Sequence, residues 1–244
     1  MAELLRAGRR KVYDVWMADG VDQAPVLAVI TEEAERRGIP VRHTARVVLE
    51  REAATEAPQG VLAHAAPVAE VDFDDLCRPS DRAPTSGGGA RQPFVLALDG
   101  VTDPRNLGAL LRSADGAGAT GAVLTRRRSV HVTPAAAKAA AGAVEHVPMA
   151  LVAGMASALA RAKELGCWVV GLADDGDTSL FDLTIVTEPL LLVVGSEGDG
   201  LSRLVRQRCD VVASIPMAGA LPSLNVAAAG TLALYEVARR RTDG

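Results

Sequence analysis

The sequence predicts an α/β protein whose C-terminal part is a parallel β-sheet covered by helices. Short apolar runs that read as strands alternate with helical patterns along the chain. Some runs are apolar at every position, such as residues 94–98 and 190–194, which is typical of parallel strands buried on both faces. Polar, glycine-containing segments follow these runs directly. Open α/β sheets place their ligands at such strand ends.

The composition fits a packed globular protein and argues against several classes. Of the 244 residues, 49 % are hydrophobic and only 3 % are aromatic, which argues against RNA binding through a row of stacked rings. We find neither a signal peptide nor a membrane span, so we expect no membrane attachment. Cys77, Cys167 and Cys209 are widely spaced, and the four histidines show no ligand spacing. We therefore expect free thiols, no metal site and a cytoplasmic location.

The charge distribution does not by itself predict nucleic-acid binding. The formal net charge is −4, and residues 1–77 carry nine basic and fourteen acidic side chains. Any affinity for RNA is therefore expected to come from local clusters. Three short basic clusters exist, Arg9-Arg10-Lys11, Arg126-Arg127-Arg128 and Arg239-Arg240-Arg241. For each cluster alone, a solvated helix end or loop is the more common role.

Residues 1–77 are predicted to form a small α/β domain. Its pattern indicates a helix running into a strand over residues 4–19, a helix from Thr31 to Gly38, a helix over 43–52 and a strand over 59–65. Residues 78–93 contain three prolines and a run of three glycines, which is typical of a flexible linker. The second domain is therefore predicted to span residues 94–244.

The first strand of the second domain leads into a polar segment and then a helix. Asp103 is predicted to cap this helix, with Pro104 at its first position. Asn106 lies in the first turn and Arg112 one and a half turns later, so the two side chains face different sides. They can share one site only if a loop folds back or another chain contributes.

The middle of this domain has fewer distinctive residues. Strands are predicted over residues 121–125 and 167–172, and an alanine-rich helix over 134–143 has Lys138 as its only charge. The acidic segment 174–177 lacks the closing glutamate of a calcium loop. We interpret it as a solvated turn.

The last third of the chain carries most of the polar loops. After the strand 190–194, three glycines in residues 195–200 allow the backbone to approach a ligand, and Glu197 is the reactive side chain among them. Ser202 is predicted to cap a helix. The spacing matches neither the dinucleotide fingerprint nor a phosphate loop. A strand over 211–215, a polar loop and a long helix ending in three arginines complete the chain.

Three segments taken in order resemble the SpoU (TrmH) family of RNA ribose 2′-O-methyltransferases. They are residues 99–115, residues 194–201, and residues 215–219 with 223–226. Residues 4–75 also resemble the small substrate-binding domain of the branch that methylates a guanosine of 23S rRNA. The resemblance implies a SPOUT-type domain with a deep trefoil knot, a homodimer, and S-adenosylmethionine as cofactor.

The resemblance also implies roles for individual residues. Backbone groups of Gly195, Ile215 and Leu224 are expected to hold the cofactor, with Met217 nearby. The expected catalytic residues are Arg112, Asn106, Glu197 and Asn225. Because a guanidinium stays charged in proteins, we expect Arg112 to hold a phosphate and the 2′-oxygen rather than to act as a base. We also expect Glu197 to pair with Arg112.

Two alternatives stay open beside methylation of a 23S rRNA guanosine. The same chemistry on tRNA is one, although the preceding small domain favours rRNA. The other is a non-catalytic module for RNA binding or ribosome assembly, to which Ala227 gives some weight because many family members have Ser there. A nucleotide-dependent dehydrogenase is disfavoured because the glycine fingerprint is absent.

Overall fold

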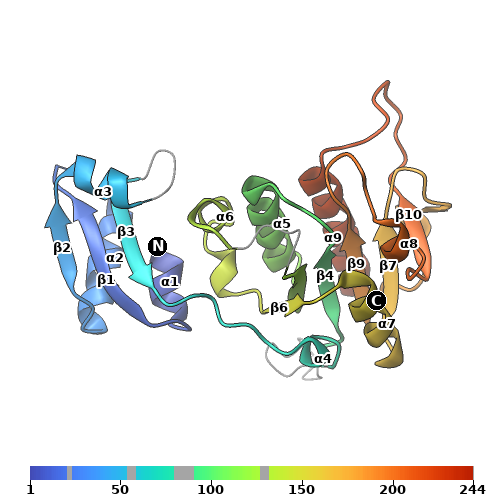
Figure 1. Ribbon diagram of the computed structural model, residues 1–244, viewed down its shortest axis with the longest axis horizontal. Coiled ribbons are helices and arrows are strands. Elements are labelled where there is room, and N and C mark those ends of the chain that lie inside the picture. The colour runs from blue at the N-terminus through green and yellow to red at the C-terminus, as the bar shows by residue number, and fades with distance from the viewer. Residues whose placement is uncertain (21–23, 54–58, 80–90, 127–131, 244) are drawn as a thin grey trace.

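The computed structural model describes residues 1–20, 24–53, 59–79, 91–126 and 132–243. Within these residues the chain forms two β-sheets, a three-stranded sheet in the N-terminal domain and a seven-stranded sheet in the C-terminal domain. Figure 1 shows the two domains side by side, joined along one edge by the segment that contains α4.

The N-terminal domain is built around β1, its central strand. Its elements are α1 (Ala2–Ala7), β1 (Val12–Ala18), α2 (Pro25–Arg36), β2 (Val41–Thr44), α3 (Arg46–Glu52) and β3 (Val61–Ala65). β1 pairs in parallel with β2 and antiparallel with β3. The predicted helix start at Thr31 is wrong, because α2 begins at Pro25 and the Thr31 hydroxyl donates to the carbonyl of Leu27 at 3.0 Å.

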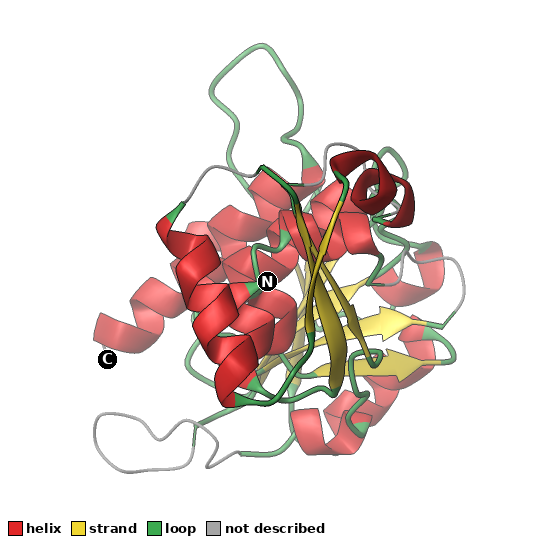
Figure 2. Cartoon of the chain, turned by 90° about the vertical axis from the view of Figure 1, so that its left-hand side faces the viewer, coloured by secondary structure: helices red, strands yellow, loops and turns green. Residues whose placement is uncertain are grey.

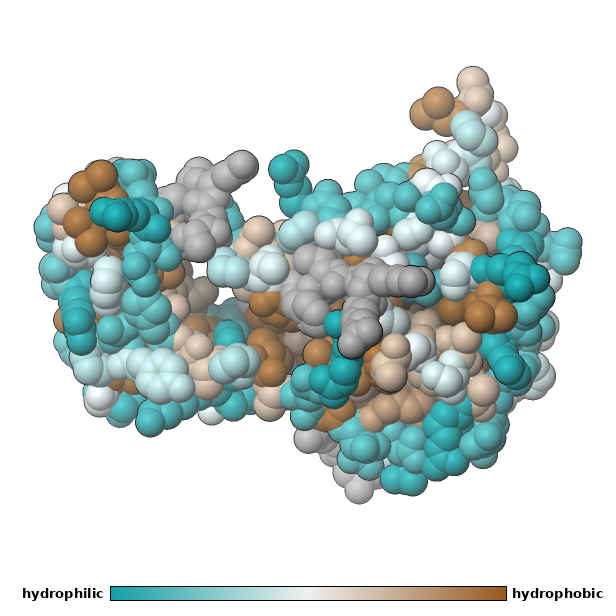
Figure 3. Space-filling view, viewed as in Figure 1, coloured by the Kyte–Doolittle hydropathy of each residue, from teal (hydrophilic) through white to brown (hydrophobic). Residues whose placement is uncertain are grey.

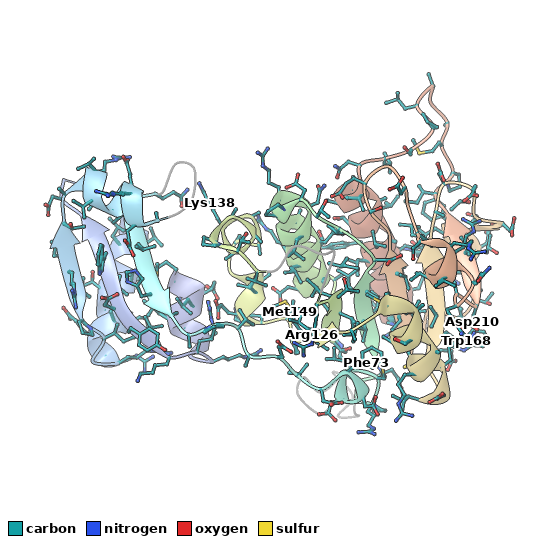
Figure 4. The ribbon with its side chains drawn as sticks, in the orientation of Figure 1. Phe73, Arg126, Lys138, Met149, Trp168 and Asp210 are labelled. Atoms are coloured by element: carbon teal, nitrogen blue, oxygen red, sulfur yellow. The ribbon has the colours of Figure 1, made fainter. Side chains whose placement is uncertain are left out.

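The segment that follows β3 packs on the C-terminal domain. The Val71 N–H donates to the Met149 carbonyl at 2.9 Å, and Arg126 pairs with Glu70 at 2.7 Å; Figure 4 labels Met149 and Arg126 at this junction. The short helix α4 (Phe73–Leu76) leads to Leu76 and Cys77, which are buried in the C-terminal core. Residues 70–77 therefore pack with the second domain, whereas the sequence assigned them to the first. Most of the predicted linker, residues 80–90, lies outside the described residues.

The C-terminal sheet confirms the predicted parallel architecture. Its strands are β4 (Phe94–Leu98), β5 (Gly121–Thr125), β6 (Met149–Val152), β7 (Trp168–Leu172), β8 (Thr178–Ser179), β9 (Leu190–Val194) and β10 (Val211–Ser214). They lie in the order β6-β5-β4-β9-β7-β10-β8, and every neighbouring pair is parallel. The two fully apolar runs predicted as central strands, β4 and β9, are adjacent and entirely buried.

Helices cover both faces of this sheet (Figure 2). α5 (Pro104–Gly116), α6 (Pro134–Ala139) and α9 (Val226–Asp243) pack on one face, and α7 (Met155–Glu164) and α8 (Arg203–Arg206) on the other. Short 3-10 turns lie at Ala143–Glu145 and Leu180–Asp182. Side chains alternate along β4, so Phe94, Leu96 and Leu98 enter one core while Val95 and Ala97 enter the other.

The alanine-rich helix ends earlier than predicted. α6 stops at Ala139, and the chain turns through Ala141 with φ 51° and Gly142 with φ 100°. A side chain at Gly142 would place its Cβ 2.6 Å from Cβ of Glu3 in α1. The N-terminal helix therefore lies directly on this turn, where only glycine leaves room for it.

Most of the described residues in the three basic clusters contact other parts of the protein. Arg9 and Arg10 contact the C-terminal domain, and Arg126 pairs with Glu70. Arg240 and Arg241 donate to backbone carbonyls of the segment that leads into β9, among them those of Leu183 and Val186, and Arg239 pairs with Glu236. Arg127 and Arg128 lie outside the described residues. These arginines thus mainly stabilise the fold.

Candidate functional site

A cavity of about 450 Å³ lies at the carboxyl ends of β7, β9 and β10. Three loops form its walls, and they include residues 172–175, 194–201 and 215–226. Figure 3 shows the loop between β10 and α9 projecting from the surface with apolar residues near its tip, and Leu221 in this loop is 73 % exposed. The predicted ligand position at the strand ends therefore has a matching cavity.

The loop after β9 needs its glycines for shape. A Cβ on Gly195 would lie 2.2 Å from the carbonyl carbon of Gly200. Gly198 and Gly200 have φ of 91° and 65°, a region that favours glycine. Ser196 and Gly200 exchange backbone hydrogen bonds of 3.0 and 3.2 Å. The result is a tight loop whose backbone faces the cavity.

Three predicted catalytic residues form a continuous polar chain beside this loop. Asn106 Nδ2 donates to Glu197 Oε1 at 2.6 Å, and Asn225 Nδ2 lies 3.4 Å from Asn106 Oδ1. The Oδ1 of Asn225 accepts the Ala227 N–H at 2.8 Å, so this side chain also caps the start of α9. Residues from α5, the β9 loop and the α9 start are thus brought together.

All four predicted cofactor residues line the cavity: Gly195, Ile215, Met217 and Leu224. Among the hydrogen bonds of the described residues, none involves the backbone of Gly195, Ile215 or Leu224. Their N–H and C=O groups are therefore available to a ligand.

Arg112 lies elsewhere in its own chain, and the expected pair between Glu197 and Arg112 does not form within the chain. Glu197 bonds to Asn106 instead. The exposed Arg112 lines a second cavity, together with Glu3, Asp115, His146 and residues 140–143. The physical reason is the helical spacing: at about 100° per residue, Asn106 faces the α9 side of α5 and Arg112 the α6 side.

Sequence reasoning missed two groups near the first cavity. The segment interpreted as a solvated turn supplies Asp174 and Asp175 to its wall. Arg206 donates to Asp175 at 2.6 Å and holds the pKa of that carboxyl below its usual value. Asp99 accepts the Ser202 N–H at 2.8 Å and so anchors the glycine loop. The sequence contained a signal for both groups, because the acidic segment and Asp99 each follow a predicted strand at the same edge of the sheet.

The lining of the first cavity combines apolar walls with an excess of carboxylates. Leu172, Val194 and Ile215 supply apolar surface, while four acidic side chains and one arginine supply charge. Such a lining suits a ligand that has a planar apolar part and a positive charge. Within the described ranges, no group of His, Cys, Asp and Glu could hold a metal ion, and no helix is long and apolar enough to span a membrane.

Two family models match the chain. Residues 93–235 match the model described as the SpoU rRNA methylase family. Residues 2–71 match the model described as RNA 2′-O ribose methyltransferase substrate binding.

Known proteins match over nearly the full length. The chain is 40 % identical to the putative TrmH family tRNA/rRNA methyltransferase YacO of Bacillus subtilis, over 95 % of this chain and 90 % of the relative. It is 37 % identical to the 23S rRNA (guanosine-2′-O-)-methyltransferase RlmB of Shewanella oneidensis, over 98 % and 93 %. Among solved structures, the SpoU methyltransferase AviRb of Streptomyces viridochromogenes in complex with the cofactor AdoMet superimposes with a TM-score of 0.79 at 26 % identity, covering 100 % of this chain and 88 % of AviRb.

Proposed function

Because this chain belongs to the SpoU rRNA methylase family, we propose that it transfers a methyl group from S-adenosylmethionine to the ribose 2′-hydroxyl of a guanosine in 23S rRNA. The observation that carries this proposal is the cavity at the strand ends, whose glycine loop adjoins the Glu197–Asn106–Asn225 chain. The choice of a 23S rRNA guanosine as substrate rests on the relatives named RlmB. The match of residues 2–71 to a substrate-binding model supports an RNA substrate.

The first cavity fits the cofactor. The free backbone groups of Gly195, Ile215 and Leu224 would hold it, with Met217 nearby, and the surrounding carboxylates would favour its positive charge. When bound, S-adenosylmethionine supplies a methyl group on a sulfonium, which is already electrophilic. The protein therefore has to position the ribose hydroxyl in line and assist loss of its proton.

The hydrogen-bonded chain Glu197–Asn106–Asn225 and Arg112 have different roles in this reaction. Asn106, held by Glu197 and Asn225, orients the ribose through hydrogen bonds. Arg112 holds a neighbouring phosphate and stabilises the negative charge that develops on the 2′-oxygen. Since Arg112 faces away from the first cavity of its own chain, a second copy supplies this guanidinium.

A homodimer therefore completes the site. Leu232 and Tyr235, spaced one helical turn apart on α9, are 38 % and 50 % exposed. Tyr235 Oη lies 2.6 Å from where a Cβ of Gly116 would stand, so this apolar stripe adjoins α5, the helix that carries Arg112. Covering the stripe with a second copy brings Arg112 toward the partner's cofactor cavity.

A trefoil knot is the chain path that we propose for this region. Two features support it: β9 inserts between the earlier strands β4 and β7, and the loops after β9 and β10 line one cavity before α9 returns to α5. Three cysteines without disulfides fit the reducing cytoplasm that contains the rRNA.

The alternatives are weaker. A tRNA substrate is disfavoured by the match of residues 2–71 to a substrate-binding domain. A non-catalytic module is disfavoured because Asn106, Glu197 and Asn225 are present and hydrogen-bonded. Ala227, which replaces the usual Ser, still contributes its backbone N–H to Asn225.

Methyl transfer from labelled S-adenosylmethionine to unmodified ribosomal RNA tests the proposal. We expect label in 23S rRNA that survives alkali as a 2′-O-methyl group, and we expect Arg112→Ala to abolish it. The exposed Arg208, just beyond the end of α8, provides a matched control, and Arg208→Ala should keep full activity. Label in tRNA alone would mean that the substrate is tRNA and not 23S rRNA. Cofactor binding without transfer to any RNA would favour the non-catalytic module.

A further inference from the structure

The second cavity lies between the two domains and has a volume of about 300 Å³. α1 contributes Glu3, α5 contributes Arg112 and Asp115, and the turn after α6 contributes residues 140–143. We propose that this cavity receives the base of the nucleotide to be methylated, and that Asp115 selects guanine by accepting hydrogen bonds from its Watson–Crick edge. The proposal rests on the methyltransferase function above and specifies how that enzyme chooses its nucleotide.

One face of α5 carries the groups that RNA requires. Arg105 and Arg112 are seven residues apart, which places both on the same side of the helix. Both are exposed, and neither side chain has a hydrogen-bond partner among the described residues. Two unpaired guanidinium groups along one helix face suit consecutive phosphates of an RNA strand. The base next to the phosphate at Arg112 then points toward the cavity that Arg112 lines.

Of the two carboxylates at this cavity, Asp115 is the available one. Glu3 accepts hydrogen bonds from Arg6 and from His146, each at 3.0 Å, and these partners hold its pKa below the usual value. The exposed side chain of Asp115 makes no hydrogen bond or ion pair within the described part of the chain. Asp115 also lies three residues after Arg112, on an adjoining side of α5.

The chemistry of a carboxylate selects guanine. An ionised carboxylate only accepts hydrogen bonds, and its two oxygens can accept a pair of parallel ones. Guanine offers such a pair, from N1–H and the 2-amino group. Adenine offers a lone pair at N1, which a carboxylate repels, and uracil offers a single N–H. A site built to accept two hydrogen bonds discriminates strongly against a base that lacks one donor.

The cavity is formed before RNA arrives. The N-terminal helix rests on Gly142, where a side chain would collide with Glu3. Arg10 binds Glu145 just beyond the turn, and Arg9 donates to the His146 carbonyl at 3.0 Å. Ligand sites occur preferentially at domain interfaces, and a preformed site loses little entropy when it binds.

Inosine provides an atom-level test because it differs from guanosine only in lacking the 2-amino group. We would prepare RNA with guanosine or inosine at the methylated position, and compare kcat/KM for wild type, Asp115→Ala, Asp115→Asn and Asp182→Ala. Asp182 is an exposed aspartate in the 3-10 turn Leu180–Asp182, away from the lining of either cavity, and serves as the matched control. Cofactor affinity, measured on the same preparations, reports whether each variant is folded.

Wild type and Asp182→Ala should prefer guanosine by about 10- to 100-fold, the range of one charge-assisted hydrogen bond. Asp115→Ala and Asp115→Asn should bind the cofactor normally but lose this preference, with activity on guanosine reduced to the level of inosine. Wild type that methylates both RNAs equally, or Asp115 variants that keep the preference, would overturn the inference while leaving the methyltransferase function intact. Wild type that methylates neither RNA would overturn the function itself.

Discussion

Arg10 and Glu145 are separated by 135 residues in the sequence and form a bidentate ion pair across the domain boundary. Arg10 Nε donates to Glu145 Oε2 at 3.0 Å, Nη2 donates to Oε1, and Nη1 donates to the Ala66 carbonyl at 2.9 Å. The Glu145 side chain is only 4 % exposed. A planar guanidinium in this geometry fixes orientation as well as distance, so the domains meet in a defined arrangement.

Breaking this pair should uncouple the domains. Arg10→Ala leaves Glu145 buried without its partner and should lower stability by about 3–5 kcal/mol, whereas the double change to alanine should lower it by less than the two single losses together. Arg6→Ala is the control, since its exposed pair with Glu3 is worth about 1 kcal/mol or less. Denaturant unfolding of wild type, Arg10→Ala, Glu145→Ala, the double variant and Arg6→Ala measures these losses. Additive losses would contradict a direct coupling between Arg10 and Glu145.

Gly195→Ala should strongly weaken cofactor binding. Its Cβ would lie 2.2 to 2.4 Å from backbone atoms of Gly200 and Leu201, so the loop must move away from the geometry that exposes its backbone. Gly219→Ala is the matched control, because a Cβ there meets nothing within 4 Å. Calorimetric titration with S-adenosylmethionine should show affinity reduced about 100-fold or more for the first variant and little change for the second.

Mixing two inactive variants should restore activity if Arg112 acts in the partner's site. Arg112→Ala and Glu197→Gln are each expected to be inactive alone. After unfolding and refolding together, half of the dimers are mixed and each has one intact site, so about a quarter of wild-type activity should return. Activity that stays absent in the mixture, with mixed dimers demonstrated, would mean that Arg112 serves its own chain.

The N-terminal domain should lose stability as pH rises from about 6.5 through the raised pKa of His64. His64 lies 2.6 Å from Asp14 and 3.2 Å from Glu52, and these carboxylates raise the pKa of His64, the hydrogen bond with Asp14 being the larger cause. Because the folded-state pKa exceeds the unfolded value near 6.5, the contribution is complete below that pH and is lost as pH rises through the folded pKa. NMR titration of the ring should give the raised pKa. Thermal melts of His64→Gln should lack this pH dependence.

Replacing Arg241 should lower the stability of the protein more than replacing Arg239 of the same basic cluster. It donates to the Val186 carbonyl at 2.7 Å and to the Pro93 carbonyl at 3.1 Å, and it stacks over the Phe94 ring. Burial lowers its pKa to about 10. Arg241→Ala removes the donor to the part-buried carbonyls of Val186 and Pro93 and should cost about 2–4 kcal/mol, measured by denaturant unfolding. Arg239→Ala, whose pair with Glu236 is exposed on the arginine side, should cost less than about 1 kcal/mol.

Local patterns were sufficient to predict most of the C-terminal sheet. The runs at Phe94 and Leu190 are apolar at every position, and the structure places both strands side by side in the buried centre. Asp103 and Pro104 start α5 as predicted, with the Asp103 side chain accepting the Arg105 N–H at 2.8 Å. Both predictions depend on residues close in sequence, where period and capping chemistry decide the outcome.

Features set by distant contacts could not be predicted in this way. The sequence expectation joined Glu197 to Arg112, but the hydrogen bond formed is to Asn106, because α5 turns Arg112 to its other side. Nothing near Glu145 in sequence indicates that Arg10 covers it. The early end of α6 likewise depends on α1, which rests on the turn at Gly142. Each outcome depends on how elements pack, and local propensity does not encode packing.

The cap that Asn225 places on α9 has a consequence for protein synthesis. The same side chain orients Asn106 and starts the final helix, which runs from Val226 to the end of the described chain. Chains emerge from the ribosome N-terminus first, so Asn225 and α9 are made after α5 and the β9 loop, the two elements that they join. A growing chain therefore cannot close the hydrogen-bonded series Glu197–Asn106–Asn225 until Asn225 and α9 have been made.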